Sequence, residues 1–594
     1  MATLWDRLER HLPFVQGPSQ YIGGEFNSVR KDPESVAVRV GLAFPDVYKI
    51  GMAHLGLQIF YGQINERPDA LCERIFAPWT DLEERMRGDG IPLFSLDSHR
   101  PVREFDIVGF SLQSEMGYTN IVNMLDLAGI PIWATDRRQG DPIVVGGGPN
   151  SSYPEPVAEF FDIILIGDGE ESFPRLVDIV KETRDRDSVL RRAMAEVPGA
   201  YVPRFYRVDY NSDGTVRSIE ATEGAPMPVK KALVADFTSA YFPLRPIVPF
   251  AEVVHDRINL EIMRGCPHRC RFCHAVNFKN KLRFRPVDVL VQQAEAVYKS
   301  TGHDEIALTS LSSGDYPHIA ELMTRLNARF GMRKVSVSLP SLRIDERLAE
   351  LPRLLKTVRK SGFTVAPEAG TEELRRIIRK PIRDEDLWAT ARAAFEEGWN
   401  HLKLYFMIGL PGETERDIDG IVETARRVSA VGKEMQGRPA DVNVTVSPMV
   451  PKPHTPFQFA GQKPFEYVQA VEDRLARLAR GSRVHLKLHD PRTGYVEAVL
   501  ARGDRRVARA VVEAWKLGAR FDEWREHFNF ERWMQAFRNA GIDPDFYARR
   551  EIGVGEALPW DHFDIRLSKE VLWKDWEECR KSADQREEKQ GIAC

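Results

Sequence analysis

The chain has few cysteines, little net charge and no long apolar run. Its 594 residues include six cysteines and carry a formal net charge of −4. So few cysteines exclude a disulfide-stabilised secreted scaffold, and the small charge provides no surface-wide field for a polyanion such as nucleic acid. No segment approaches the ~20 consecutive apolar residues of a membrane helix, and the N-terminus lacks the apolar core of a secretory signal. We therefore expect a cytoplasmic protein that has no membrane partner.

The residues that are present indicate a multidomain α/β protein. The composition, 43% hydrophobic and 29% charged, is that of a globular chain, and the length exceeds what one core supports. In the N-terminal third, short apolar runs such as 36–44, 105–112, 141–149 and 161–170 alternate with helical patterns. This alternation predicts a Rossmann-like parallel sheet, in a domain of residues 1–240 that ends in a linker with one small hairpin.

A second strand series and a helical segment follow this domain. Six strand candidates between residues 257 and 451 recur at spacings of roughly thirty to forty residues, typical of a βα array. They predict a (βα)6 partial TIM barrel in residues 241–480, with its chemistry at the loops after the strands. Residues 481–594 are predicted to form a mainly helical domain packed by Trp515, Trp524 and Trp533.

Three of the cysteines lie close together in RGCPHRCRFCHAVNF, residues 264–278. The thiolates of Cys266, Cys270 and Cys273 on one tight loop can bind a soft metal centre. A 4Fe-4S cluster held by three thiolates keeps one iron open, as a catalytic zinc keeps an open position. A structural zinc with His268 or His274 as its fourth ligand is the alternative.

The remaining cysteines, Cys72, Cys579 and Cys594, lie far apart in the sequence. A second cluster held by these three is a further alternative.

The cysteine spacing, with Phe272 before the last cysteine and a strand before the loop, resembles the radical S-adenosylmethionine (SAM) superfamily. The resemblance implies that the open iron chelates the amino and carboxylate groups of SAM. It also implies that reductive cleavage of SAM gives a 5′-deoxyadenosyl radical, and it places Phe272 at the cofactor.

Three later segments match positions that bind SAM in this superfamily. The segment LTSLSSGDYP (308–317) stands where a Gly-Gly-Glu-like motif is usual, and it offers Ser312 and Ser313 but no Glu. Glu368 in APEAGTE matches the carboxylate that binds the ribose; a helix N-terminal acid is the alternative. Gly409 and Gly412 in IGLPGET match the adenine segment; an ordinary Gly-Pro-Gly turn is the alternative.

The Rossmann-like part resembles the cobalamin-binding subclass through the segment IVVGGGPNSSYPEPVAEFFDIILIGDGEES, residues 143–172. The cobalamin motif Asp-x-His-x-x-Gly is absent, so we expect no histidine below the cobalt; His54 as that ligand is the alternative. A domain that binds no cofactor, or binds part of the substrate, is a second alternative. The cobalamin contacts that the resemblance implies are Ser111, Gln113, Gly146, Gly147, Gly148, Gly167, Asp168, Gly169 and Glu170.

Several segments, among them YIGGEFNSVRKD (21–32), PKPHTPFQF (451–459) and ARGDRRVARAVVEAW (501–515), are similar to one bacterial family of B12-binding radical SAM proteins. The similarity implies three cofactors, a 4Fe-4S cluster, SAM and cobalamin, and an electron donor such as flavodoxin or ferredoxin. In the commonest reaction of the subclass, a methyl group reaches an unactivated carbon of the substrate, which is here unknown. Ring rearrangement would use the same parts.

Two other functions remain open. Methylthiolation of tRNA or a ribosomal protein is one, although it normally needs three N-terminal cysteines and this third of the chain has only Cys72. A non-catalytic iron–sulfur protein that binds RNA or ribosomes is the other. The sequence indicates no catalytic acid, base or second radical residue.

Overall fold

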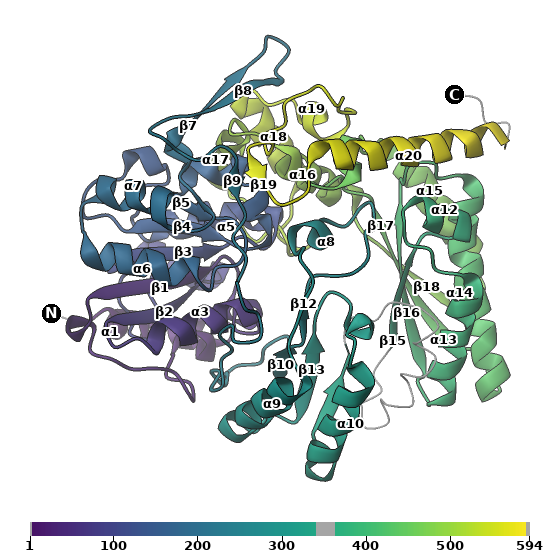
Figure 1. The fold of residues 1–594 in the computed structure, drawn as a ribbon, viewed down its shortest axis with the longest axis horizontal. Coiled ribbons are helices and arrows are strands. Elements are labelled where there is room, and N and C mark those ends of the chain that lie inside the picture. The colour runs from purple at the N-terminus through teal and green to yellow at the C-terminus, as the bar shows by residue number, and fades with distance from the viewer. Residues whose placement is uncertain (1–2, 340–362, 590–594) are drawn as a thin grey trace.

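A six-stranded sheet in the order β2-β1-β3-β4-β5-β6 opens the computed structural model, which describes residues 3–339 and 363–589 (Figure 1). Its strands are parallel except β6, which runs antiparallel to β5. The connection changes direction between β1 and β3, and ligands of such sheets bind at this switch point, beside the carboxyl ends of the strands. The strands are β1 (Val38–Phe44), β2 (Ala70–Phe76), β3 (Ile107–Ser111), β4 (Ile143–Gly147), β5 (Ile163–Leu165) and β6 (Ala200–Tyr201).

Helices cover this sheet, which explains its nearly continuous apolar strands. Phe60 of α3 and Phe173 of α6 meet edge to face at 5.5 Å, so the two helices are neighbours. The opposite helix α5 packs against α17 from the C-terminal part of the chain. The helices of this part are α1 (Leu4–Leu8), α2 (Tyr48–Gly51), α3 (Leu55–Asn65), α4 (Thr80–Asp89), α5 (Tyr118–Leu127), α6 (Ser172–Glu182) and α7 (Arg186–Glu196).

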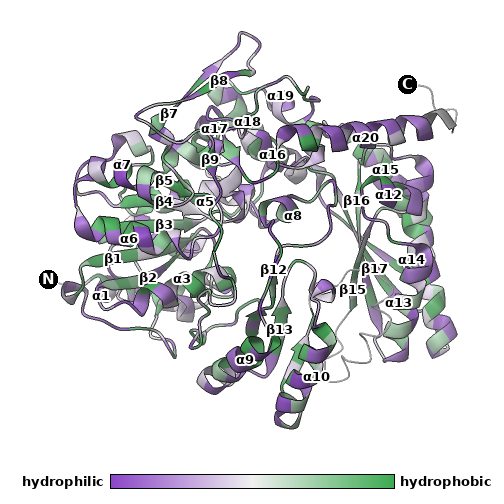
Figure 2. Ribbon diagram, viewed as in Figure 1, coloured by the Kyte–Doolittle hydropathy of each residue, from purple (hydrophilic) through white to green (hydrophobic). Residues whose placement is uncertain are grey.

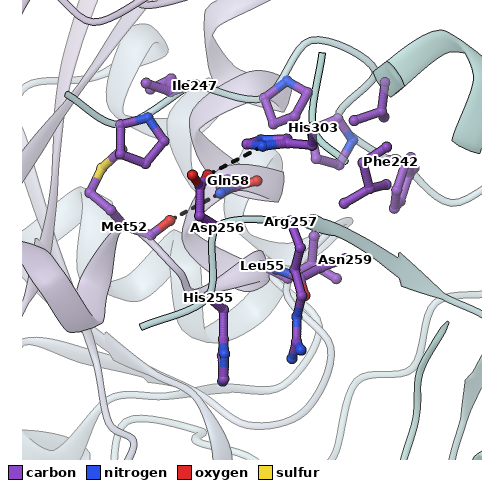
Figure 3. A pocket seen from close by; sticks show the side chains of 15 residues that line it. Met52, Leu55, Gln58, Phe242, Ile247, His255, Asp256, Arg257, Asn259 and His303 are labelled. Atoms are coloured by element: carbon purple, nitrogen blue, oxygen red, sulfur yellow. Dashed lines mark hydrogen bonds and ion pairs between the residues drawn. The ribbon is translucent and has the colours of Figure 1, made fainter. Parts of the chain in front are cut away.

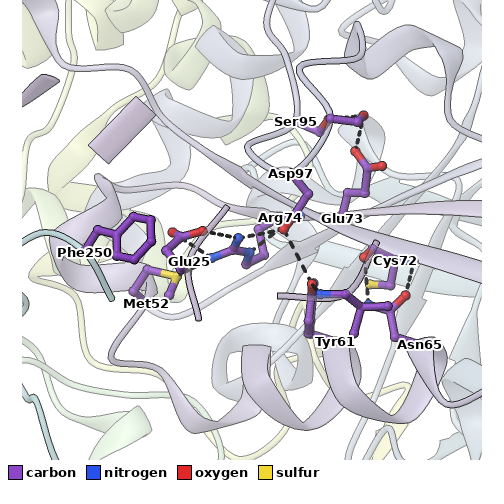
Figure 4. Close-up of polar contacts among 12 residues, drawn as sticks. Glu25, Met52, Tyr61, Asn65, Cys72, Glu73, Arg74, Ser95, Asp97 and Phe250 are labelled. Atoms are coloured by element: carbon purple, nitrogen blue, oxygen red, sulfur yellow. Dashed lines mark hydrogen bonds and ion pairs between the residues drawn. The ribbon is translucent and has the colours of Figure 1, made fainter. Parts of the chain in front are cut away.

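A buried ionic cluster fastens the N-terminal extension to the outer strand β2 (Figure 4). The Arg74 guanidinium, 1% exposed, donates to Glu25 Oε2 at 2.8 Å and to Asp97 Oδ1 at 2.6 Å. On the same strand, the Cys72 N–H donates to Asn65 Oδ1 at 2.9 Å. Cys72 is therefore a buried structural residue of β2. In Figure 1, β2 and α20, the helix that contains Cys579, lie on different sides of the molecule, and Cys594 lies outside the described residues.

The central part of the chain contains two parallel sheets, β10-β13-β14 and β15-β16-β17-β18, whose strands alternate with helices. The predicted barrel-type βα array is confirmed. Its sheet continues beyond residue 480, since β18 is hydrogen-bonded to β17. The strands are β10 (Ile258–Glu261), β13 (Glu305–Thr309), β14 (Ser336–Ser338), β15 (Phe363–Glu368), β16 (His401–Ile408), β17 (Asp441–Pro448) and β18 (Val484–Leu488).

Shorter elements and the helices of the array complete this part. The strands β11 (Met263–Arg264) and β12 (Arg283–Phe284) form an antiparallel pair on either side of the cysteine loop. The helices are α8 (His274–Phe278), α9 (Val287–Thr301), α10 (Ile319–Phe330), α12 (Glu372–Ile377), α13 (Asp384–Glu396), α14 (Glu415–Gln436) and α15 (Phe465–Ala479).

The C-terminal helices share one hydrophobic core with the N-terminal sheet, whereas the barrel has its own core. Trp533 is fully buried, Trp515 Nε1 donates to Asn123 Oδ1, and Trp524 Nε1 donates to Asp46 Oδ1, each of the latter two at 3.1 Å. The tryptophans therefore pack the helices against the first domain, and not only against one another. The helices are α16 (Pro491–Arg502), α17 (Val507–Lys516), α18 (Phe530–Ala540), α19 (Pro544–Ala548) and α20 (Lys569–Lys589).

Two short pairings complete the fold. The predicted linker holds the hairpin β7 (Tyr206–Tyr210) and β8 (Val216–Ala221), and β9 (Val229–Lys230) pairs with β19 (Phe563–Asp564). In Figure 2 apolar residues gather in the strands while polar residues lie on the outer faces of the helices. Within the residues that the structure describes, no helix combines the length and apolar character that crossing a bilayer requires.

Candidate functional site

The three clustered cysteines lie on the loop between β11 and α8, just after the first strand of the array. Cys270 is buried, and Cys266 and Cys273 are half-buried. Burial, together with the neighbouring thiols of Cys270 and Cys266, raises the pKa of Cys273 to about 11. A positive centre bound at the loop would therefore be needed to hold this sulfur as a thiolate. Among residues 3–339 and 363–589, no group of three or more His, Cys, Asp or Glu side chains has the geometry to hold one metal ion.

The two histidines considered as zinc ligands have other partners. His268 Nε2 lies 2.8 Å from Asp315 Oδ2, and His274 Nε2 lies 2.9 Å from Ser152 Oγ. Burial, with nearby His454 and Lys452, holds the pKa of His274 well below its usual range. His274 thus connects the cysteine loop to the glycine-rich segment of the first domain.

The segment after β13 contains a carboxylate, Asp315, that the sequence motifs did not point to. Asp315 Oδ2 accepts hydrogen bonds from Ser312 Oγ, at 2.6 Å, and faces His268 of the cysteine loop. Ser313 Oγ donates instead to the Leu308 carbonyl at 2.8 Å, within its own strand connection. Asp315 follows Ser313-Gly314 directly, so a small-small-acid pattern was the available signal. The serine segment and the cysteine loop are held together by this one carboxylate.

Glu368 ends β15 in a left-handed conformation, with φ +70°. Its Oε1 accepts from Lys380 Nζ at 2.8 Å. The first-turn acids of α12 are Glu372 and Glu373, so Glu368 is not a helix N-terminal acid. A non-glycine residue held at positive φ costs of order 1–2 kcal/mol, and such positions cluster at functional sites.

The two glycines of IGLPGET have different surroundings. The Gly409 N–H donates to Glu413 Oε1 at 2.7 Å, and Tyr467 OH donates to the same carboxyl at 2.5 Å. A Cβ on Gly412 would lie 2.7 Å from the Ala583 Cβ, so this glycine allows α20 to approach the loop. Both residues have positive φ, +79° and +72°, in a turn of sequence Gly-Leu-Pro-Gly. Phe272 is half-buried against the core shared by the first domain and the C-terminal helices.

A cavity of about 350 Å³ opens at the switch point of the N-terminal sheet. One wall is largely apolar and comes from the carboxyl ends of β1, β3 and β4 and from α3 and α6. The other wall comes from the barrel and holds Glu261, Arg264, Lys279 and Thr309. The structure brings all the predicted cobalamin contacts to this cavity: Ser111, Gln113, Gly146, Gly147, Gly148, Gly167, Asp168, Gly169 and Glu170.

Arg264 joins the two walls of this cavity. Its guanidinium lies 3.2 Å from Asp168 Oδ1, 2.7 Å from Glu170 Oε1 and 2.9 Å from Glu261 Oε2. Burial alone would raise the pKa of Asp168, but Arg264, with Lys279 and Arg283, lowers it to about 2. Arg264 stands two residues before Cys266, so the Gly-Asp-Gly-Glu loop is tied directly to the cysteine loop. In the sequence, only its position directly before Gly265 and Cys266 marked Arg264 as a candidate site residue.

His54 lines the cavity as the N-cap of α3. Its Nδ1 accepts from the Leu57 N–H at 3.2 Å, so the neutral ring carries its proton on Nε2. Burial first, and then the Lys279 charge, lower the pKa of His54 to about 4. The ring therefore presents no free nitrogen lone pair, and its side chain also has Gln113 as a hydrogen-bond partner. Nearby, Gln113 Nε2 donates to Ser111 Oγ at 2.5 Å.

Two family profiles match the chain: that of radical SAM proteins, N-terminal, over residues 56–203, and that of the radical SAM superfamily over residues 260–425. Together they span more than half of the sequence, and the second includes the cysteine loop.

The chain belongs to the radical SAM superfamily of enzymes.

One relative and one solved structure are similar to this radical SAM protein over most of its length. An uncharacterised protein of Methanocaldococcus jannaschii is 28% identical over 480 residues, 79% of this chain and 90% of that protein. The radical SAM methyltransferase TsrM from Kitasatospora setae, solved with cobalamin and a [4Fe-4S] cluster bound, superposes with a TM-score of 0.51 at 16% identity. That superposition covers 85% of this chain and 99% of TsrM, and it confirms the predicted fold class.

A second group of relatives matches only part of this radical SAM protein. Ribosomal protein uS12 methylthiotransferase RimO of Synechocystis is 25% identical over 186 residues, 28% of this chain and 39% of RimO.

The C-terminal helix α20 fastens the segments predicted to bind SAM. Asp575 Oδ1 accepts from Arg271 Nε, between Cys270 and Cys273, at 2.8 Å. At its other end Arg586 donates to the Gly412 carbonyl at 2.9 Å and pairs with Asp417 at 2.7 Å. One helix thus contacts both the cysteine loop and the IGLPGET loop.

A second, smaller pocket lies where α3 meets the start of the barrel (Figure 3). It holds about 20 Å³, room for about one water molecule. His303 Nδ1 lies 3.2 Å from Asp256 Oδ1, and Gln58 Nε2 donates to the Met52 carbonyl at 3.0 Å. Such a pocket is a packing feature of the domain interface.

Proposed function

We propose that this radical SAM enzyme uses cobalamin and methylates an unactivated carbon of a substrate still to be identified. The observation that carries the proposal is the cavity at the switch point, whose two walls join the Rossmann-type sheet to the cysteine loop through Arg264. A ligand in this cavity would contact the carboxyl ends of both β3 and β10. A ligand in this position would lie close to a second molecule bound beside the cysteine loop, as transfer of a group between the two requires.

The cysteine loop suits a 4Fe-4S cluster because it offers three neighbouring thiols and no nearby fourth ligand among the described residues. When bound, the cluster supplies an electron and an open iron that chelates SAM. The chain itself orients the loop through Arg271 and His268. We assign Asp315 and Ser312 to the amino end of SAM and Glu368 to its ribose, because a carboxylate accepts two hydrogen bonds from a diol.

The cavity suits cobalamin because apolar side chains and the glycine backbone from 146 to 148 form one wall beside an edge of the sheet. When bound, cobalamin supplies a cobalt that carries a methyl group. Ser111 and Gln113 would face its lower side, and His54 would present an N–H there. The proposal therefore predicts a cobalt without a histidine ligand from this chain.

Methylthiolation is the second candidate, supported by the partial match to RimO. Against it stands Cys72, which is fully buried in β2 and is the only cysteine of the N-terminal third. The third candidate, a non-catalytic protein that binds RNA or ribosomes, would cleave no SAM. A cytoplasmic location and a flavodoxin or ferredoxin as electron donor complete the proposal, since both thiols and cluster need a reducing compartment.

The test is anaerobic purification from cells supplied with cobalamin, followed by reduction with SAM. We expect about four irons per chain, as a 4Fe-4S cluster requires, bound corrinoid, and both 5′-deoxyadenosine and S-adenosylhomocysteine as products. The triple variant Cys266→Ala, Cys270→Ala, Cys273→Ala should lose the iron, whereas the control Cys72→Ala should keep it. Iron retained by the triple variant contradicts the cluster, absence of corrinoid contradicts the cobalamin assignment, and absence of 5′-deoxyadenosine contradicts the enzyme.

A further inference from the structure

The barrel wall of the cavity contains one cation that its neighbours leave without a partner. Arg264 is bonded to Asp168, Glu170 and Glu261, and Arg283 donates to Asp168 at 2.6 Å. These two guanidiniums make the direct ion pairs of the three carboxylates, and the Lys279 charge balances the remaining negative charge at longer range. Within the described part of the chain, the Lys279 ammonium has no hydrogen bond and no ion pair; its one contact of this kind is the Phe278 ring, at 5.4 Å.

The backbone holds Lys279 in place. Its N–H donates to the Ala275 carbonyl at 2.9 Å, which ends α8. Lys231 Nζ donates to the carbonyls of Phe278 and Asn280, at 2.6 and 2.7 Å, on either side of this residue. A Cβ on Gly265 would lie 3.0 Å from the Lys279 carbonyl, so the turn sits directly on the start of the cysteine loop. The backbone that carries the Lys279 side chain into the cavity is therefore held in place on both sides.

The Lys279 ammonium lies within electrostatic reach of both walls of the cavity. Its charge acts on His54 and Asp168 of the sheet and on Glu261 of the barrel. Lys279 is half-buried; partial burial first, and then the Arg264 charge, lower its pKa, while the nearby carboxylates of Asp168, Glu261 and Glu170 act in the opposite direction. An ammonium that is partly shielded from water is stabilised when an anion accepts its hydrogen bonds.

We propose that Lys279 binds an oxyanion, a carboxylate or a phosphate, carried by a ligand of this cavity. The proposal rests on the proposed function only for the identity of that ligand. Two sources share the chemistry: the phosphodiester of the cobalamin nucleotide tail, and an acidic group of the substrate. A ligand without such a group would leave the ammonium without a hydrogen-bond acceptor among the described residues.

The first arm of the test compares cobalamin with cobinamide, which lacks the tail phosphodiester. Dissociation constants are measured by equilibrium dialysis for the wild type, Lys279→Met and Lys279→Arg. The control is Lys281→Met, which removes the same charge from an exposed position outside the cavity. If the tail is the source, Lys279→Met weakens cobalamin by about 10- to 100-fold, the range of a charged hydrogen bond. Cobinamide binding then stays unchanged, and Lys279→Arg restores most of the cobalamin affinity.

The second arm uses inorganic phosphate as the probe. The thermal midpoint is measured in rising phosphate against chloride at equal ionic strength, with and without corrinoid. If the substrate is the source, phosphate raises the midpoint of the corrinoid-loaded wild type and of Lys281→Met but not of Lys279→Met, and both corrinoids bind all variants equally.

The proposal is overturned if Lys279→Met matches the wild type in both arms, which includes an equal response of both proteins to phosphate. If the wild type binds no corrinoid, the cobalamin assignment fails, and phosphate on the corrinoid-free protein still decides the role of Lys279.

Discussion

Replacing Asp575 by Asn should loosen both the C-terminal helix and the cysteine loop. Asp575 joins α20 to Arg271 at 2.8 Å and to Arg379 at 2.8 Å, while Arg271 also donates to the Ile377 carbonyl at 2.6 Å. Arg271 is the residue between Cys270 and the final Phe-Cys pair. Asp575 is therefore the shorter of two carboxylate links between the helix and the loop, since Glu578 Oε2 lies 3.6 Å from Arg271 Nη2.

The magnitude follows from the exposure of the partners. The side chains of Asp575 and Arg271 are 14% and 7% exposed, so this bond is largely shielded from water. Losing a hydrogen bond to a charged group costs about 1.5–3 kcal/mol. The Arg379 side chain is 40% exposed, and its pair adds only about 0.2–1 kcal/mol after screening by solvent. A loss of about 2–3 kcal/mol corresponds to an opening of α20 that is roughly 30- to 150-fold more frequent.

Native-state hydrogen exchange measures this opening locally, which a multidomain chain requires because one global unfolding energy is ill defined for it. Amides of α20 and of residues 266–273 should exchange faster in Asp575→Asn, while those of the N-terminal sheet keep their wild-type rates. Glu577→Gln is the matched control, since Glu577 is exposed on the same helix. Equal exchange in Asp575→Asn and Glu577→Gln would refute the coupling, as would faster exchange spread over the whole chain.

Three further outcomes are expected. Gly412→Ala should speed hydrogen exchange in α20, because the new Cβ would lie 2.7 Å from the Ala583 Cβ and the backbone φ is +72°. Together the contact and the backbone strain cost about 2–4 kcal/mol. Gly518→Ala is the control for backbone strain alone, because Gly518 has φ +95° and no neighbouring atom near its Cβ position. Arg74→Met should leave Glu25 and Asp97 buried and unpaired, and lower the calorimetric midpoint of the N-terminal domain through a loss of about 3–5 kcal/mol; an unchanged midpoint would contradict this. Burial raises the pKa of Glu413 from 4.5 to about 7, so its contribution to stability is present below pH 4.5 and is lost as the pH rises through 7. Glu413→Gln should therefore lose less stability than the wild type between pH 5 and pH 8 in thermal melts, and parallel curves would count against the assignment.

Local patterns predicted the fold and the cysteine loop well. The strand and helix periodicities of both α/β series depend on neighbours along the chain, and the six-stranded sheet and the barrel array follow them. The radical SAM assignment depended on one short spacing and is confirmed by the family match. The roles of Glu368, Gly409 and the cobalamin contacts stay predictions, although the structure gathers the last group in one cavity.

Other features depended on residues far apart in the sequence and were missed. Asp315 bonds to His268, Arg264 bonds to Glu170, and Asp575 bonds to Arg271. Nothing in the local sequence of either partner specifies such a pair. Gly412 shows the same limit, because its need for glycine comes from α20 and not only from its own turn.

The sequence by itself determined the order of the elements, the three-thiol loop and the superfamily, because periodicity and spacing are short-range properties. Only the tertiary structure decided that the C-terminal helices share the core of the first domain, and that one helix fastens the cysteine loop. It also decided that, within the residues described, the Lys279 ammonium in the cavity has no hydrogen bond and no direct ion pair. Whether a charge is paired depends on every group that folding brings around it, and those groups come from both domains.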